Sequence, residues 1–155
     1  MHPYVKNLAY ILKHKYYVFI ECCKLGMPLR GIIHDFSKFS PSEFKPYAMY
    51  FFSENGKELY RQEFDKAWLH HHRSNKHHWE YWVEHMYLEV SEGFVFKPIK
   101  MPEKYMKEML ADWRGAGRAI NGTDDTFGFY LKNKDKMILH HETREWIEQQ
   151  LLKNN

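Results

Sequence analysis

The sequence has no apolar run long enough to cross a membrane. A spanning helix needs about 18 to 20 apolar residues, and the nearest stretch, residues 8–25, is interrupted by charged side chains. We therefore expect neither a membrane span nor a secretory signal. Cysteine is also scarce: Cys22 and Cys23 are the two in the chain. Because neighbouring residues in a helix point in different directions, they should not form an ordinary disulfide. These features favour a reduced, cytoplasmic protein with no membrane association.

Signs of a domain boundary are missing as well. The chain contains no internal repeat, no linker and no low-complexity segment, and its 155 residues suit one domain spanning residues 1–155. It also lacks a block of Lys and Arg, and its net charge is only +3. A nucleic acid polymer is therefore not the expected partner, and an anionic small molecule suits the charge at least as well. The oligomeric state is left open.

Strand patterns are few, whereas helix patterns are frequent. Apolar spacing near 3.6 residues and terminating glycines predict an all-α bundle of about six or seven helices. The longest expected helices cover about residues 3–24, 58–72, 103–120 and 142–151. A further helix after Ser74 is expected to place His78, Trp82 and His85 on one face. Residues 87–99 alternate around Ser-Glu-Gly and predict one short β-hairpin.

Histidine, by contrast, is concentrated in one stretch. Five of the residues between 70 and 78 are histidines: His70, His71, His72, His77 and His78. Imidazole is the commonest side-chain ligand of metals, and a solvated surface has no need of so many rings. We expect His71 and His78 to project from apolar helix faces toward a shared site. His70 and His72 should point away, as surface residues or as residues that support the ligands.

Two further positions carry buried polar side chains. His34 and Asp35 follow an apolar turn in a helix expected to start near Pro28, where an imidazole and a carboxylate could hold the same cation. Burying such groups without partners costs several kcal/mol, although a hydrogen-bonded His–Asp pair in a core would also satisfy them. Asp112 falls among the packed positions of its own helix. It should bind a cation or form an ion pair with Arg114 or Arg118, unless the carboxylate is slightly exposed to solvent.

The order of these residues resembles that of a known superfamily. His14, then His34-Asp35, then Asp112, in a helical chain, is similar to the HD-domain superfamily of metal-dependent phosphohydrolases, in which these positions hold one metal. His34-Asp35-Phe36-Ser37-Lys38 resembles the His-Asp-x-x-Lys form found in cyclic-dinucleotide phosphodiesterases. That branch adds a His and a His-His pair for a second metal, and His71 and His77-His78 match those positions.

The resemblance also sets limits. Members with three metals carry a Glu one turn before the first His, where this chain has Tyr10, so at most two metals are expected. The Gly-Tyr-Pro element of the cyclic-dinucleotide enzymes is absent after His78. Residues 76–79, 111–118 and 131–136 are also similar to a small branch of the superfamily that occurs in bacteria and their phages and has no described function.

The resemblance implies a phosphomonoesterase or phosphodiesterase that uses a metal-activated water. Asp35 is the candidate carboxylate bridge between two ions, and mixed imidazole and carboxylate ligands suit one or two ions of Mn, Fe, Co, Ni or Zn. Lys38 lies one turn after His34 and could contact the substrate phosphate, or could simply be solvated. Weaker candidates for phosphate binding are Lys76, Arg114, Arg118 and Lys132.

Three functions follow from this interpretation. The first is hydrolysis of a nucleotide, a cyclic nucleotide or another small phosphoester. The second is an HD-type di-iron oxygenase, because a His-rich two-metal site is compatible with that chemistry. The third is a metal-stabilised module that binds a nucleotide without turnover.

Overall fold

The chain forms an all-α fold with one β-hairpin, as the sequence predicts. The structure, a computed structural model, describes residues 1–88 and 93–153. Its helices are α1 (Pro3–Lys24), α2 (Pro28–Ile33), α3 (Pro41–Phe52), α4 (Gly56–Leu59), α5 (Arg61–Ser74), α6 (Glu103–Asn121), α7 (Thr126–Asn133) and α8 (His141–Leu152). The strands are β1 (Val83–Leu88) and β2 (Gly93–Pro98). Short 3-10 turns cover Phe36–Phe39, Trp79–Trp82 and Lys134–Lys136.

Long-helix boundaries agree with the signals in the sequence. Pro3 occupies the first turn of α1, where its missing N–H is not needed. Gly26 and Gly122 follow α1 and α6 with φ of 74° and 79°, a left-handed conformation that glycine adopts without strain. The described part of the chain holds eight α-helices, in agreement with a bundle of about six or seven, and the helix expected over about residues 58–72 is divided into the short α4 and the longer α5. None of the eight is long and apolar enough to cross a membrane.

Two expectations about local structure are wrong. His34 and Asp35 do not lie within a helix, because α2 ends at Ile33 and Asp35 adopts a left-handed conformation with φ 52°. Lys15 of α1 donates hydrogen bonds to the carbonyls of Ile32 and His34, which satisfies the end of the helix.

The helix expected after Ser74 is also absent from the described residues. The chain there forms the 3-10 turn Trp79–Trp82 and then β1, which pairs antiparallel with β2 from Val83 opposite Pro98 to Leu88 opposite Gly93. His85 therefore lies exposed on a strand and does not share a face with His78. The hairpin itself is confirmed, and it begins earlier than residue 87. Residues 89–92 of the expected hairpin lie outside the described residues.

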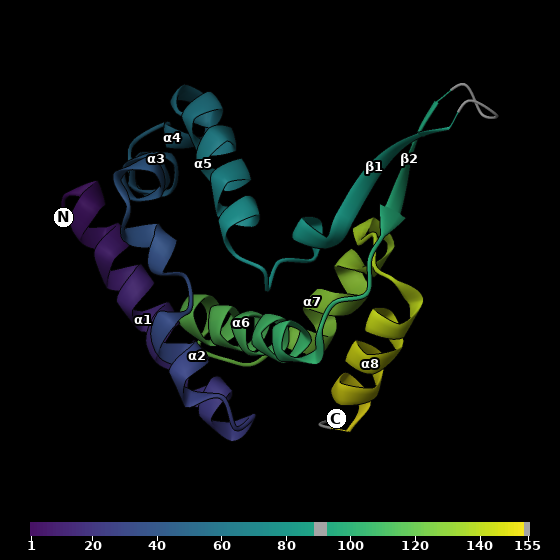
Figure 1. Cartoon of the computed structure of the whole chain (residues 1–155). Helices are drawn as coiled ribbons and strands as arrows, with labels where there is room; N and C mark the ends of the chain where they lie inside the picture. The colour runs from purple at the N-terminus through teal and green to yellow at the C-terminus, as the bar shows by residue number, and fades with distance from the viewer. Residues whose placement is uncertain (89–92, 154–155) are drawn as a thin grey trace.

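The packing of α1 determines how the polar residues meet. This helix contacts α2, α3 and α6, while α3 also packs against α5 (Figure 1). A Cβ on Gly115 of α6 would come within 2.4 Å of Val18 Cγ2 on α1, so glycine allows the two helices to approach closely. This close approach places Asp112, one turn before Gly115, beside His14 of α1.

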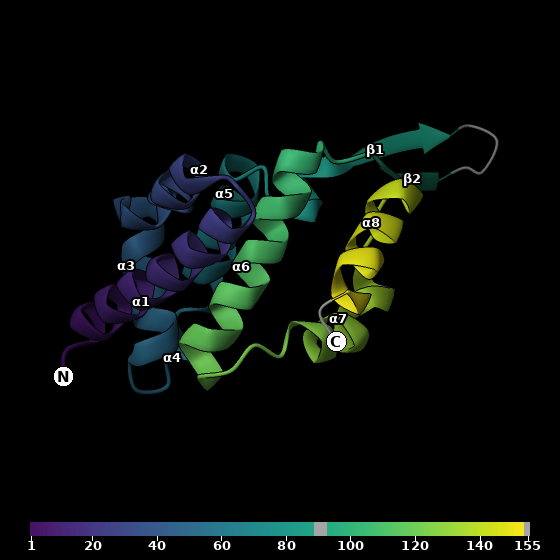
Figure 2. The same ribbon diagram turned by 90° about the horizontal axis from the view of Figure 1, so that it is seen from below.

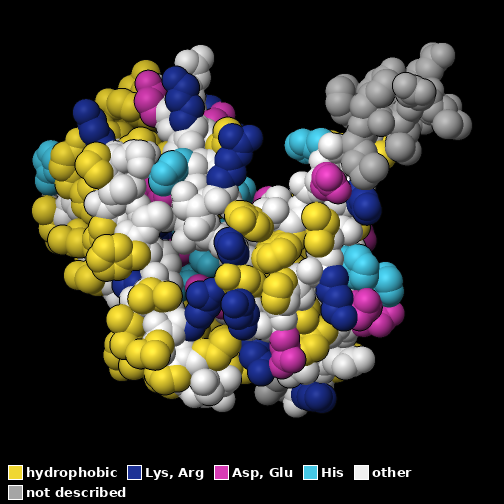
Figure 3. Space-filling view, in the orientation of Figure 1, with side chains coloured by type: hydrophobic (Ala, Val, Ile, Leu, Met, Phe, Trp, Pro, Cys, Tyr) yellow, Lys and Arg dark blue, Asp and Glu magenta, His cyan; other side chains and the backbone are white. Residues whose placement is uncertain are grey.

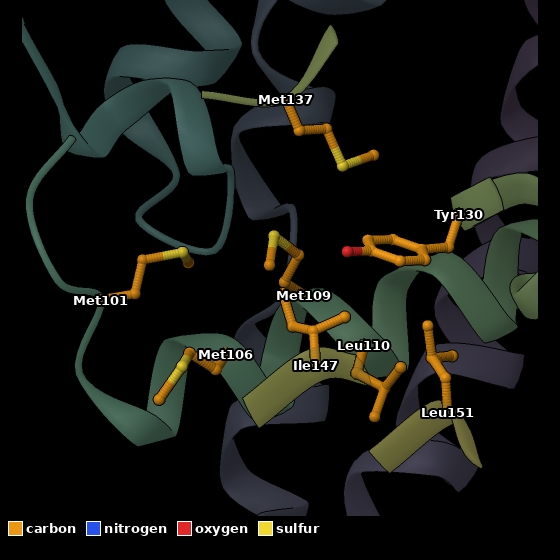
Figure 4. Close-up of a cluster of buried hydrophobic side chains, with 8 residues drawn as sticks. All are labelled: Met101, Met106, Met109, Leu110, Tyr130, Met137, Ile147 and Leu151. Atoms are coloured by element: carbon orange, nitrogen blue, oxygen red, sulfur yellow. The ribbon is translucent and has the colours of Figure 1, made fainter. Parts of the chain in front are cut away.

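A separate apolar core lies at the other side of α6. Figure 2 shows α7 and α8 beyond α6, on the side away from α1. The side chains buried where α6, α7 and α8 meet form one cluster (Figure 4). Its members are Met101, Met106, Met109, Leu110, Tyr130, Met137, Ile147 and Leu151. Four of these are methionines, whose flexible side chains fill irregular gaps. One face of α6 thus serves the apolar core while another faces the polar residues.

Candidate metal centre

The structure brings all seven predicted metal ligands together. They form two sets of four donors that share Asp35, with the donor atoms of each set within 4.8 Å of one another. The first set is His14, His34, Asp35 and Asp112, and the second is Asp35, His71, His77 and His78. These residues come from α1, α5, α6 and the two segments that follow α2 and α5. Sequence-distant elements therefore converge on one buried centre.

Distances in the first set are short and consistent. His14 Nε2 and His34 Nε2 lie 3.1 and 3.3 Å from the same oxygen, Oδ1 of Asp112. They lie 3.6 and 3.3 Å from Oδ2 of Asp35. Metal–nitrogen bonds of about 2.0–2.1 Å place neighbouring ligand atoms about 2.9–3.4 Å apart around one ion. The donor spacing therefore suits a single transition metal.

The second set uses the other oxygen of Asp35. Oδ1 of Asp35 lies 3.5 Å from His71 Nε2 and 3.3 Å from His77 Nε2. His78 Nε2 lies 2.8 Å from His71 Nε2, so two ring nitrogens face each other. Each carboxylate oxygen of Asp35 is thus turned to a different set. Its left-handed backbone, which Asp tolerates better than most residues, places the side chain between the sets.

Two carboxylates outside the sets hold the rings in place. His34 Nδ1 donates a 3.2 Å hydrogen bond to Glu108, and His77 Nδ1 lies 3.4 Å from the same oxygen. His71 Nδ1 similarly donates a 2.9 Å hydrogen bond to Glu43. A proton on Nδ1 leaves the Nε2 lone pair free, so these contacts fix the tautomer that a metal needs. Both glutamates are buried.

Sequence reasoning missed Glu43 and Glu108. Each lies on a helix, where a glutamate is ordinarily a surface residue. A signal does exist for Glu108: it precedes Asp112 by four residues and so shares its helix face. Burial raises the pKa of Glu108, but hydrogen bonds from His34 and His77 outweigh burial and lower this pKa to about 2. The group is therefore a permanent carboxylate.

Burial and charge separate the histidines into two kinds. Burial lowers the pKa of His77, and His34 adds to this effect. Burial also lowers the pKa of His78 well below its usual value, with further repulsion from His77 and His71. Neutral imidazole is the form that binds metals. In His34, the carboxylate of Asp35 overcomes burial and raises the pKa.

Lys38 lies at the centre, as expected. Its Nζ is 2.5 Å from Oδ2 of Asp35, and the side chain is only 13% exposed. Burial would lower the pKa of Lys38, but the carboxylates of Asp35 and Asp112 outweigh burial and raise it. Lys38 therefore stays an ammonium ion beside the shared carboxylate, and the alternative of a fully solvated lysine does not hold.

Buried atoms without partners test whether the residues fit a metal. His14 Nε2, His34 Nε2 and His77 Nε2 are buried, and within the described residues none of them has a hydrogen-bond partner. Oδ1 of Asp35 is likewise buried without a hydrogen-bond partner in that part of the chain, whereas Oδ2 contacts the ammonium group of Lys38. Native proteins rarely leave buried polar atoms unsatisfied. All of these atoms point into the two sets, so a bound cation would satisfy them together.

Within the described residues, the side chains of the other predicted cations do not pair with either set, although Lys76 lines a small cavity beside Asp35 and His77. Arg114 and Arg118 both pair with Glu21 of α1, so neither provides the ion pair that was the alternative for Asp112. Lys132 is exposed and lines a separate cavity beside Trp113. Lys76 is exposed and stacks over Tyr81, next to a smaller opening near His77. The structure does not bring these four cations together.

The remaining histidines of the rich stretch differ from each other. His70 is on the surface, as expected, and donates a 2.7 Å hydrogen bond to Glu43. His72 is instead buried between Trp68 and His78, with ring centroids 4.1 and 4.8 Å away. Burial lowers the pKa of His72 to about 4, so the ring is neutral. It supports the ligand His78 rather than facing solvent.

Two cavities give access to the centre. The larger, about 630 Å³, is lined by His14 and Asp112 of the first set and by His71 and His78 of the second. The smaller, about 240 Å³, reaches Asp35 and His77 from another direction. Figure 3 shows histidine side chains in a depression near the middle of one face, bordered by Lys and Arg side chains. Both sets are thus accessible to a small molecule.

Comparisons with known proteins identify a family but no activity. Residues 4–153 match the sequence profile of a family described as Family of unknown function (DUF5662). No curated protein and no solved structure matches the chain.

Proposed function

We propose, for a chain that belongs to a family of unknown function (DUF5662), that the buried His–Asp centre hydrolyses a small phosphoester. One observation carries the proposal: Asp35 turns one carboxylate oxygen toward each of two four-donor sets. Two divalent cations that share a carboxylate are a recurring arrangement in phosphoester hydrolysis. The donor order also supports our proposal that the chain is related to the HD-domain superfamily.

The residues around the centre would each have a separate role in hydrolysis. When bound, the ions would lower the pKa of a water molecule and neutralise charge on the phosphoryl oxygens. Lys38 would place its ammonium group against a phosphoryl oxygen, since it lies at the wall of the larger cavity. Glu43 and Glu108 would keep the imidazoles oriented. Hydrolysis would then add water across one P–O bond and release an alcohol.

Donor chemistry narrows the choice of metal. The first set offers two imidazoles and two carboxylates, whereas the second offers three imidazoles and the shared carboxylate. Such mixed sets suit Mn, Fe, Co, Ni or Zn and are unlike the oxygen-only sites of Mg. One or two ions of this group are therefore part of the proposal. A cytoplasmic location is also part of it, and the free thiols of Cys22 and Cys23 are compatible with that compartment.

A di-iron oxygenase is the second candidate. The imidazole-rich second set favours it, because three imidazoles and a carboxylate are well suited to iron. Iron content, colour and oxygen consumption by the purified protein would support this function. A nucleotide-binding module would instead bind a nucleotide tightly without turnover.

A phosphate-release screen tests the proposal. Purified protein is loaded with each of the five metals and assayed for phosphate release from nucleotides and simple phosphoesters, and for ring opening of cyclic nucleotides to nucleoside monophosphates, with His34→Ala as the variant at the centre. His85→Ala is the matched control, because His85 is an exposed histidine on β1. We expect phosphate release by the wild type and by His85→Ala, and none by His34→Ala. Equal activity in both variants would show that another site is responsible.

A further inference from the structure

The larger cavity has an apolar interior beyond the metal ligands. Its walls come from α1, α3, α5 and α6 and include Tyr10, Tyr47, Phe51, Phe52, Trp68 and Ile120. A volume of about 630 Å³ lies within the range of cavities that hold small organic ligands. A simple phosphate or a short hydrophilic ester would leave most of these walls in contact with water. The cavity therefore provides room for a substantial organic group.

Positive charge in this cavity is limited to a single side chain. Among the described residues that line it, Lys38 alone is a lysine or arginine, and it already pairs with Asp35. Arg114 and Arg118 pair with Glu21 at a different cavity. A triphosphate or a dinucleotide brings several negative charges, and burying an unpaired charge is strongly unfavourable. The cavity therefore offers Lys38 and the metal ligands to one phosphoryl group, and its described lining residues include no further lysine or arginine for a second.

A buried hydroxyl adds a directional feature. Tyr47 is 8% exposed and lines the cavity, and its hydroxyl oxygen is buried without a hydrogen-bond partner among the described residues. Buried tyrosine hydroxyls ordinarily find a partner. A tyrosine hydroxyl carries a proton near neutral pH and can donate a hydrogen bond. A ligand that carries an acceptor at this point would complete the missing hydrogen bond.

We infer that the cavity binds an organic molecule that carries one phosphoryl group, with a flat apolar ring system against the aromatic walls and a hydrogen-bond acceptor at Tyr47. The location of the phosphoryl group rests on the proposed function, whereas the ring site rests on the cavity itself. The class includes aryl phosphates and nucleoside monophosphates, and it excludes polyphosphates and dinucleotides.

Binding of non-hydrolysable probes tests the ring site without relying on turnover. Calorimetry on the metal-loaded protein compares naphthylmethylphosphonate with methylphosphonate and with inorganic triphosphate. We expect the naphthyl compound to bind about tenfold to a hundredfold more tightly than either, because the ring leaves water. Equal or tighter binding of methylphosphonate or triphosphate would overturn the inference.

Matched variants locate the binding site. Phe51→Leu should weaken binding of the naphthyl compound severalfold, while Phe129→Leu, at an exposed phenylalanine that lines another cavity, should not. Quinolinylmethylphosphonate adds one acceptor nitrogen to the same ring. The quinolinyl compound should bind more tightly than the naphthyl compound to the wild type. The same difference should appear in Tyr16→Phe, a control at an exposed tyrosine, and should vanish in Tyr47→Phe. A difference that persists in Tyr47→Phe would refute the role of Tyr47.

The two proposals can fail separately. Tight, Phe51-dependent binding of the naphthyl compound without phosphate release from naphthyl phosphate would refute the hydrolase and retain the ring site. Metal-dependent release at equal rates from naphthyl phosphate and glycerol phosphate, with no effect of Phe51→Leu, would retain the hydrolase and refute the ring site.

Discussion

The polar centre and the apolar core share α6 but are built in opposite ways. On one face of this helix, Met106, Met109 and Leu110 pack against α7 and α8. On another, Glu108 and Asp112 contact three imidazoles, those of His14, His34 and His77. The apolar core is complete, since its members contact one another and water is excluded. The polar centre contains buried donor and acceptor atoms without partners.

This difference separates stability from function. Burial of apolar area stabilises a fold without a ligand, whereas unpaired buried polar atoms oppose folding until something binds them. Unpaired buried polar atoms therefore benefit the protein only if they bind a ligand that its function requires. We therefore expect changes in the core to alter stability alone and changes in the centre to alter metal binding and activity.

The largest effect should come from Asp35→Ala. Because Asp35 belongs to both sets, its loss should impair both metal positions and reduce kcat/KM by at least about a thousandfold, or about 4 kcal/mol. Metal analysis of the purified variant and the phosphate-release assay measure the two effects. Asp124→Ala, outside both sets, is the control. Full metal content in Asp35→Ala would contradict a shared carboxylate.

Met109→Ala makes the reciprocal change in the core. Met109 is 1% exposed, and removing a buried methionine side chain typically costs about 2–5 kcal/mol in the free energy of unfolding. Chemical denaturation measures this loss, while metal content per folded chain should not change. A fall in metal content would show that the two faces of α6 are coupled.

Metal removal should lower the free energy of unfolding of the wild type and leave that of Asp35→Ala unchanged. A ligand present at about 100 to 1,000 times its Kd adds about 2.7–4.1 kcal/mol to the free energy of unfolding. Chelation should therefore lower Tm by roughly 10 °C in a chain of this length. Met109→Ala should lose the same increment, because its polar centre is intact. An unchanged melting curve after complete metal removal would argue against a metal in the centre.

The sequence predicts the helices that form the apolar core better than it predicts the backbone of the polar centre. Apolar periodicity and the glycines at 26 and 122 are local signals, so α1 and α6 appear nearly as expected. The resemblance to the HD-domain superfamily also predicts all seven residues that the structure brings together. It does not predict the shape of their backbone: the left-handed turn at Asp35 depends on Lys15 from another helix.

Partners distant in sequence account for the other differences. The sequence offers Arg114 and Arg118 as partners of Asp112 or of a phosphate, yet both pair with Glu21 from α1. Trp82 donates a 2.8 Å hydrogen bond to the carbonyl of Lys76, which stabilises a turn where a helix was expected. Glu43 and Glu108 look like surface residues until the fold places imidazoles against them. Each of these features requires the tertiary structure.

Removing the carboxylates that orient the rings should have a moderate effect. Changes to residues that hydrogen-bond metal ligands typically cost about 10 to 100-fold in metal affinity. Glu43→Gln should weaken the second set alone, because Glu43 contacts His71 and not the rings of the first set. Glu108→Gln should weaken both, because Glu108 contacts His34 and His77. Competition with a chelating dye measures each affinity, and identical profiles for the two variants would refute this assignment.

The smallest effect should come from Arg118→Gln, which tests whether α6 arginines serve the structure or the substrate. The ion pair with Glu21 is partly buried, and its loss should cost about 1 kcal/mol in the free energy of unfolding while kcat/KM stays constant.

The same variant has a predicted pH dependence. Burial raises the pKa of Glu21, but hydrogen bonds from Lys24 and Arg118 outweigh burial and lower this pKa. A carboxyl whose pKa is lower in the folded state adds stability above its ordinary pKa and loses it as the pH falls. Urea denaturation should therefore separate the variant from the wild type at neutral pH; the difference should begin to narrow near pH 4.5 and disappear only below the lowered pKa of Glu21 in the folded state. A raised KM at unchanged stability would instead place Arg118 at the phosphoryl group.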